Sequence, residues 1–208
     1  MTAITRDKQD IAIVGCMASG KSTIAKLLSD KLGYKYFEEN FTGNPYLERY
    51  YEDPRRWAFA NEVWFMMEKA QQSYNIAWYQ GSTVQDSPLV SVVYFSAAMR
   101  NAGCLDLEDY SLIVRAFNYI YDVTPKPTDF VYLKVHEDVV MDRIKSRGRA
   151  FEQSEEVGRE YIKESIDNIE TLLNRPNYDP RRYIHSAITV DGNQSPDDVV
   201  KDIIKEVT

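Results

Sequence analysis

An eight-residue loop near the amino terminus constrains the fold of this chain more than any other feature. Residues 15–22 read Gly-Cys-Met-Ala-Ser-Gly-Lys-Ser, the pattern GxxxxGK[ST]. An apolar run at 11–14 precedes the loop, and apolar residues recur at helical spacing after it. This order predicts a strand, a tight loop and a helix, with the backbone N–H groups of the loop turned into one concavity that binds phosphate. The sequence therefore predicts binding of a nucleoside triphosphate.

Two side chains at the end of this phosphate loop are expected to contact the phosphates and a metal ion. Lys21 is expected to reach the β- and γ-phosphates, and the Ser22 hydroxyl to take one position on an octahedral Mg²⁺ ion. The candidate ATP-binding residues are Gly15, Cys16, Met17, Ala18, Ser19, Gly20, Lys21, Ser22 and Thr23.

Apolar segments alternate with segments of helical periodicity along the rest of the chain, which is typical of successive βα units. Five strands are predicted, at 10–15, 35–38, 82–86, 129–135 and 187–191. A long helix is predicted from about Arg56 to the region of Trp78, and a last helix begins at Ser195. We expect an α/β fold of three layers, with a mostly parallel sheet and ligands at the carboxyl ends of its strands.

The length and composition of the chain narrow the function classes. The 208 residues suffice for one well-buried core, so a single domain, 1–208, is expected. A net charge of −7 argues against a nucleic-acid partner, and two cysteines are too few for a disulfide framework. Neither an apolar leader nor a membrane-spanning run occurs in the sequence, so we expect a cytoplasmic protein with no membrane partner.

Carboxylates follow two of the predicted strands. Glu38 and Glu39 close the second strand, where a carboxylate could accept a proton from an acceptor hydroxyl near the γ-phosphate; the alternative is a solvated acidic turn. Asp86 closes the third strand, where it could help to hold magnesium or could simply form a turn before Pro88.

Three arginines lie within seven residues, at Arg143, Arg147 and Arg149. On a helix the first two share one face, and Gly148 would let the backbone turn so that the third approaches the phosphates. Such a group could form a lid over a transferring phosphoryl group, whereas the alternative is a basic helix end that favours the helix dipole.

The order and spacing of these motifs resemble the deoxynucleoside kinase family from about residue 11 to about residue 173. The motifs are the phosphate loop, Phe37-Glu38-Glu39, Asn44-Pro45-Tyr46-Leu47, the aromatic-rich segment 51–59 and the basic segment 143–152. The resemblance implies the P-loop kinase fold, an Arg-rich lid at about 147–156, and a homodimer formed through helices.

The resemblance also implies roles for individual residues. Glu39 matches the base that activates the 5′-hydroxyl, with Glu38 as the fallback, and Tyr51 and Glu152 match the pair that holds the sugar 3′-hydroxyl. The residues that match contacts to donor phosphates and the transferring group are Arg143, Arg147 and Arg149.

At the base end of the site, Trp57 and Phe59 look like parts of the substrate wall. Glu62 stands where many members have a glutamine that reads the base edge, and Lys69 where many have an arginine. An ionised carboxylate donates no hydrogen bond, so the base preference should differ from theirs.

One further departure concerns the end of the third strand. The family usually has an acidic residue followed by Arg-Ser or Arg-Thr there, whereas this chain has Asp86-Ser87-Pro88. Further along the same segment, some members use an acidic residue in base selection, and this chain has Val92 at that position. Either another cation such as Lys69 substitutes for the arginine, or the acceptor differs, or activity on ordinary deoxynucleosides is weak.

The leading hypothesis is transfer of the γ-phosphoryl group of ATP, with Mg²⁺, to the 5′-hydroxyl of a deoxynucleoside. The magnesium partners would be Ser22 and Asp86. The alternatives are a kinase for nucleoside monophosphates or another small molecule on the same architecture, and a nucleotide-binding homologue without catalysis.

Overall fold

A five-stranded parallel sheet forms the centre of the molecule. The computed structural model describes residues 8–147, 158–175 and 183–208. The strands are β1 (Asp10–Val14), β2 (Lys35–Phe37), β3 (Thr83–Asp86), β4 (Asp129–Lys134) and β5 (Ile188–Asp191). Their order across the sheet is β2-β3-β1-β4-β5, and every neighbouring pair is parallel. All five predicted strands are therefore confirmed, and their ends differ from the predicted ones by at most one residue.

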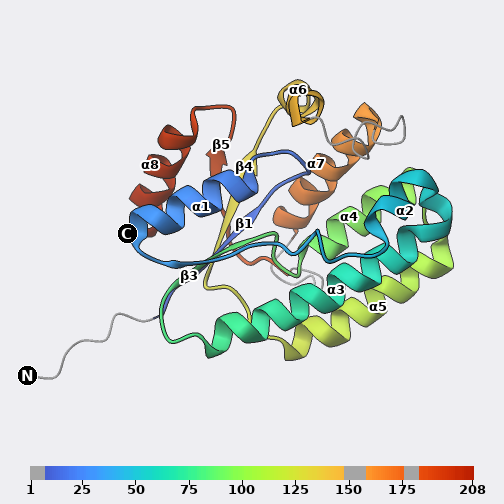
Figure 1. The fold of residues 1–208 in the computed structure, drawn as a ribbon, viewed down its shortest axis with the longest axis horizontal. Coiled ribbons are helices and arrows are strands. Elements are labelled where there is room, and N and C mark those ends of the chain that lie inside the picture. The colour runs from blue at the N-terminus through green and yellow to red at the C-terminus, as the bar shows by residue number, and fades with distance from the viewer. Residues whose placement is uncertain (1–7, 148–157, 176–182) are drawn as a thin grey trace, which may run out of the picture.

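Helices cover both faces of this sheet (Figure 1). They are α1 (Lys21–Leu32), α2 (Leu47–Glu52), α3 (Pro54–Trp78), α4 (Ser91–Asn101), α5 (Leu107–Val123), α6 (Glu137–Arg147), α7 (Arg159–Leu173) and α8 (Pro196–Val207). In Figure 1, α1 and α8 lie on one side of the strands, and α3, α4, α5 and α7 lie on the other. The predicted three-layer α/β fold is confirmed.

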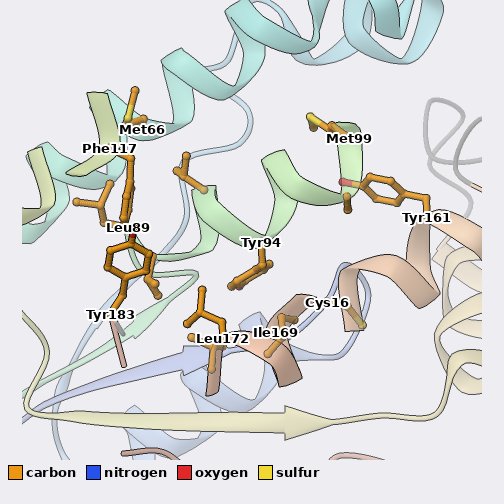
Figure 2. Packing of buried hydrophobic residues seen from close by; sticks show 14 of the residues in the cluster. Cys16, Met66, Leu89, Tyr94, Met99, Phe117, Tyr161, Ile169, Leu172 and Tyr183 are labelled. Carbon is orange, nitrogen blue, oxygen red and sulfur yellow. The ribbon is translucent and has the colours of Figure 1, made fainter. Parts of the chain in front are cut away.

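Alternating side chains of the central strands divide the core into two parts. Ile11 and Ile13 of β1 pack with apolar residues of α1 and α8, whereas Ala12 and Val14 pack with the larger helical layer. All four are fully buried, which is typical of a parallel strand covered on both faces. Figure 2 shows part of the larger layer, where Tyr94 of α4 points toward α7.

Local sequence sets the starts of two helices. The Asp53 carboxylate accepts the Arg56 N–H at 3.3 Å, and Pro54 fits the first turn because a missing N–H costs nothing there. The long helix thus begins two residues before its predicted start. At α8 the Ser195 hydroxyl accepts the Asp198 N–H in the same way, as expected.

The strand order brings the predicted motifs to one edge of the sheet. The phosphate loop follows β1 in the middle, and the register pairs Ile13 of β1 with Asp86 of β3 and Phe37 of β2 with Gln85 of β3. The ends of β1, β2 and β3 therefore lie side by side. In the described ranges, no helix combines the length and apolar character needed to cross a membrane.

Asp10 lies at the opposite, amino-terminal edge of the sheet and is buried. Its carboxylate accepts hydrogen bonds from Thr83 Oγ1 at 2.8 Å and from Gln85 Nε2 at 2.7 Å. Burial raises the pKa of Asp10 from 3.8 to about 6, although these hydrogen bonds and Lys8 oppose the shift. The folded state therefore binds this proton more tightly than the unfolded state does.

We predict that this carboxyl makes the protein less stable as the pH rises from about 4 to about 6. Because the folded pKa is the higher one, the stabilisation is complete below pH 4 and lost above pH 6, and its full size is about 3 kcal/mol. Asp10→Asn removes the charge, so the variant should exceed the parent in free energy of unfolding at pH 7.5 but not at pH 4. Urea unfolding at both pH values checks this; a variant less stable at both would contradict it.

Candidate active site

The phosphate loop adopts a tight turn between β1 and α1. Gly20 has φ 102°, a left-handed conformation that favours glycine, and Ala18 also has a positive φ of 56°. A Cβ atom at Gly15 would lie 2.6 Å from Ser19 Oγ, so a larger residue there would push that side chain away. The backbone conformation thus favours glycine at Gly20, and the space beside Ser19 favours glycine at Gly15.

Lys21 turns back over the loop and lines the cavity beside it. Its Nζ donates to the Cys16 carbonyl at 2.9 Å and lies 5.9 Å from the centre of the Phe95 ring. Although its side chain is almost fully buried, the ammonium faces a cavity, so it can exchange the carbonyl for a phosphate oxygen.

Ser22 and Asp86 form a second pair at the edge of the loop. Ser22 Oγ donates to Asp86 Oδ2 at 2.5 Å, and Asp86 is buried. Burial raises the pKa of Asp86 and nearby Glu39 raises it further, whereas Lys21 opposes the shift. In the part of the chain that the structure describes, no group of three or more His, Cys, Asp or Glu side chains could hold a metal. These two oxygen donors nevertheless fit Mg²⁺, which takes few protein ligands and completes its shell with phosphate and water.

Glu39 forms an ion pair with Lys69 of α3. Lys69 Nζ also donates to the carbonyl of Ser87 at 2.7 Å, and its side chain is almost fully buried. One ammonium therefore joins the segment after β2 to the segment after β3. Glu38, by contrast, is exposed and does not appear in the described lining of the cavity.

Ser87 occupies the position where an arginine was expected from the resemblance. Its φ of 54° is unusual for a residue other than glycine, and its hydroxyl donates to Asp86 Oδ1 at 3.3 Å. The cation beside Glu39 thus comes from Lys69 on the helix. These contacts favour the first of the three alternatives that the sequence left open, in which Lys69 substitutes for the arginine.

A cavity of about 140 Å³ lies between the phosphate loop and helices α2, α3, α4 and α7. Lys21, Glu39 and Lys69 line its polar side. Its aromatic lining consists of Phe41, Tyr50, Tyr51, Phe65, Phe95 and Tyr161. Figure 2 shows Tyr161 of α7 reaching toward Met99 of α4, which also lines the cavity. The arrangement joins a phosphate-binding end to a space with walls suited to a flat ligand.

Trp57 and Phe59 lie outside this described lining, and their assignment to the substrate wall stays a prediction. Trp57 stacks on Tyr46 with ring centres 5.9 Å apart. Guanidinium groups of Arg49 and Arg56 lie 5.0 and 5.2 Å from the Trp57 ring. Trp57, Phe59 and Phe65 all lie on α3, and the sequence did not determine the rotation of this helix, so it did not indicate which of them face the cavity.

Tyr51 does line the cavity, and its hydroxyl lies 3.5 Å from the sulfur of Met17 in the phosphate loop. Its predicted partner, Glu152, lies outside the described residues, as does Arg149. The structure therefore places one member of the predicted sugar-binding pair.

Arg143 contacts the backbone of the phosphate loop. Its Nη1 donates to the Ser19 carbonyl at 2.7 Å, and its Nη2 donates to the Gly192 carbonyl at 2.9 Å. It thereby ties the loop to the segment after β5. Arg147, one turn further along α6, is exposed and lines the cavity.

Glu62 is buried at another part of the cavity wall. Its carboxylate accepts from Ser96 Oγ at 3.1 Å and from Asn61 Nδ2 at 3.4 Å, while Asn44 Nδ2 donates to Asn61 Oδ1 at 2.8 Å. Burial raises the pKa of Glu62 from 4.5 to about 7, although Ser96 opposes the shift. Asn61 and Ser96 were not anticipated, because amide and hydroxyl residues inside helices carry no distinctive sequence signal.

Comparison with known proteins identifies the family. The deoxynucleoside kinase family model matches residues 11–208. The chain belongs to the deoxynucleoside kinase family. A deoxyguanosine kinase of Bacillus subtilis is 30% identical over 188 residues, which cover 88% of this chain and 86% of that protein. A deoxyadenosine/deoxycytidine kinase of the same organism is 31% identical over 145 residues, or 68% of this chain and 67% of the relative.

Solved structures of other deoxynucleoside kinases have a similar fold. A deoxyadenosine kinase from M. mycoides with bound dATP superimposes with a TM-score of 0.83 at 26% identity, covering 95% of this chain and 98% of that one. These findings support an enzyme that phosphorylates deoxynucleosides with ATP and do not favour the monophosphate-kinase or non-catalytic alternatives.

We predict that the Lys69 ammonium is needed for catalysis by this kinase. Lys69→Met removes the cation beside Glu39 and the bond to Ser87, so kcat/KM for the deoxynucleoside should fall about a hundredfold or more. Lys69→Arg keeps a cation and should lose less. Steady-state rates for both variants check this, and a Lys69→Met rate within threefold of the parent would contradict it.

Proposed function

We propose that the chain transfers the γ-phosphoryl group of ATP to the 5′-hydroxyl of a deoxynucleoside in nucleotide salvage, with Mg²⁺ as cofactor. One observation carries this proposal: Glu39 and the phosphate loop line the same cavity, so a base and a triphosphate site face one space. Membership of the deoxynucleoside kinase family supports the same reaction.

In the proposed reaction, Glu39 accepts the proton of the 5′-hydroxyl as its oxygen forms a bond to the γ-phosphorus. The bond from that phosphorus to the β–γ bridging oxygen breaks, and ADP leaves with the electron pair. Lys69 holds the Glu39 carboxylate toward the cavity. The groups proposed to stabilise the charge on the phosphates are Lys21, Arg143, Arg147 and Arg149.

Ser22 and Asp86 would hold the magnesium ion, which supplies positive charge at the phosphate oxygens when bound. Their hydrogen bond supports this role because it keeps a hydroxyl and a carboxylate together at the end of the loop. The buried position of Asp86 also favours a bound cation, since a second positive charge would lower the raised pKa of that carboxyl.

The acceptor would lie along the aromatic lining, with its sugar near Tyr51 and Glu152 and its base toward Glu62. Phe65 and Phe95 support this placement because both line the same cavity as Glu39 and Glu62. Relatives that act on deoxyguanosine, deoxyadenosine and deoxycytidine make these three nucleosides the first acceptors to test.

The organisation proposed for the protein follows the sequence. Residues 1–208 would form one domain with a lid at about 147–156, and two copies would pair through helices. A net charge of −7 supports small-molecule rather than nucleic-acid partners. A cytoplasmic location is also proposed, because two cysteines are too few for a disulfide framework and fit a reducing compartment.

Glu39→Gln tests the proposed base. The amide cannot take the proton, so kcat should fall by about 10²- to 10⁴-fold, while the affinity for ATP stays within about threefold. Nucleoside-dependent ADP formation and ATP binding by calorimetry measure the two effects. Glu38→Gln is the matched comparison on the adjacent residue; a larger loss in that variant would assign the base to Glu38 instead.

Asp86→Asn tests the proposed magnesium site. Loss of the charged ligand should raise the Mg²⁺ concentration for half-maximal rate by about tenfold or more, because charge dominates binding of this ion. Rates titrated with Mg²⁺ after treatment with a chelator provide the measurement. An unchanged Mg²⁺ dependence would remove Asp86 from the site.

A further inference from the structure

Met17 lies where the phosphate loop meets the space proposed for the acceptor sugar. Its side chain is partly exposed and lines the cavity. The Tyr51 hydroxyl of α2 donates to the Met17 sulfur across 3.5 Å, and Tyr51 lines the same cavity. This contact therefore joins the loop that receives the donor to a residue proposed to hold the acceptor.

The contact between Tyr51 and Met17 is one that a ligand can replace. A thioether sulfur is a weak hydrogen-bond acceptor, and a tyrosine hydroxyl has one proton to donate. In the proposed site, the 3′-hydroxyl of the acceptor sugar would take that proton. Tyr51 must therefore leave the Met17 sulfur when the nucleoside binds, and a weak acceptor offers little resistance to this exchange.

Met17 is also more exposed than two neighbouring residues that contain sulfur. Met99, which lines the same cavity, is 3% exposed. Cys16, the residue before Met17, is 2% exposed, and burial raises the pKa of its thiol although Lys21 opposes the shift. The thiolate is the form that reacts with peroxides, so a raised pKa keeps Cys16 unreactive. A small oxidant that enters the cavity therefore meets the Met17 side chain before these two.

We propose that Met17 is an oxidation site and that its sulfoxide weakens binding of the acceptor by engaging Tyr51. With hydrogen peroxide, one peroxide oxygen bonds to the Met17 sulfur, the O–O bond breaks, and the other oxygen leaves with both hydrogens as water. The sulfur is oxidised to the sulfoxide and the peroxide is reduced. The effect on the acceptor rests on the proposed function, whereas the oxidation itself does not.

The sulfoxide changes the hydrogen bond that Tyr51 makes. Oxidation converts a flexible apolar side chain into a polar one, and the new oxygen is a stronger acceptor than the sulfur. This oxygen is attached to the atom that Tyr51 already contacts, so it holds the single phenolic proton more firmly. The sugar 3′-hydroxyl then competes with an acceptor in the protein itself, and the enzyme binds the deoxynucleoside more weakly.

Treatment with hydrogen peroxide and then dithiothreitol tests the proposal, because dithiothreitol reverses the first steps of cysteine oxidation but leaves methionine sulfoxide. Mass spectrometry of peptides measures the sulfoxide at each methionine. We expect Met17 to be oxidised before Met99. The KM for the best acceptor among deoxyguanosine, deoxyadenosine and deoxycytidine should rise at least tenfold as the Met17 sulfoxide accumulates. An unchanged KM in protein fully oxidised at Met17 would overturn the proposal.

Three variants assign the effect to the contact between Met17 and Tyr51. Met17→Leu keeps an apolar side chain of similar volume without sulfur, so peroxide should leave its own starting KM unchanged. Met17→Gln places an amide oxygen near the position of the sulfoxide oxygen and should raise the KM before any treatment. Tyr51→Phe has no proton to donate, so oxidation of Met17 should change its KM less than threefold. A Met17→Leu protein whose KM rises as in the parent would overturn the proposal.

A control variant and a control ligand separate this effect from general damage. Met67 is 56% exposed on α3 and lies outside the described lining of the cavity, so Met67→Leu should respond to peroxide as the parent does. A 2′,3′-dideoxynucleoside lacks the 3′-hydroxyl, so oxidation should change its KM less than threefold. An equal rise in KM for the deoxynucleoside and the dideoxynucleoside would overturn the proposal.

Nucleoside binding by calorimetry distinguishes a failure of this proposal from a failure of the proposed function. If the parent phosphorylates none of the three deoxynucleosides, the proposed function fails. Their dissociation constants for the parent before and after oxidation, and for Met17→Leu treated in the same way, then still decide whether the sulfoxide weakens binding. Constants that oxidation of the parent leaves equal would overturn the proposal, and thermal unfolding checks that the variants and the oxidised protein are folded.

Discussion

The buried ammonium of Lys69 joins three parts of the molecule that come from distant stretches of sequence. It projects from α3, pairs with Glu39 after β2 and donates to the Ser87 carbonyl after β3. A buried cation is costly unless it is paired and hydrogen-bonded, so these contacts constrain one another. The unusual backbone of Ser87 lies at this junction, where its carbonyl accepts from the same ammonium that pairs with Glu39.

The buried charges around the cavity carry an electrostatic cost that bound ligands can relieve. Glu39 and Glu62 lie in its wall together with the cations Lys21 and Lys69, and Asp86 is bonded to Ser22 and Ser87 of that wall. Burial raises the pKa of Asp86 and Glu62, which means that their charged forms are unfavourable in the free protein. A metal ion at Asp86 and donor groups of a base at Glu62 would relieve both costs.

Sequence periodicity predicted the strands. Short apolar runs that alternate with helical segments have few possible places in a parallel α/β fold other than the buried strands of the sheet. The phosphate loop and the pair Glu38-Glu39 could be located for the same reason, because each comes at the end of a strand, and the resemblance to the family then singled out Glu39. Helical phase was harder to predict. Trp57 and Phe65 lie on the same aromatic-rich helix, yet only Phe65 faces the cavity, because the rotation of α3 is set by packing against α4 and α5.

Polar contacts between helices could not be predicted from the sequence either. Ser96 reaches Glu62 only once α3 and α4 are packed together, and no sequence motif indicates this contact. Asn61 lies beside Glu62 on α3, where its amide could equally have faced another way. The role of Lys69 was one of several alternatives, and its contacts with Glu39 and Ser87 favour it as the cation beside the proposed base. Long-range packing thus determined those features of the site that composition and spacing could not.

A crystal structure of the protein with ADP and deoxyguanosine tests the central claim most directly, namely that one cavity holds the acceptor between Glu39 and Glu62. The account predicts the 5′-oxygen within hydrogen-bond distance of the Glu39 carboxylate, with the base edge on Glu62. A nucleoside bound elsewhere, or bound in this cavity with its 5′-oxygen away from Glu39, would contradict it.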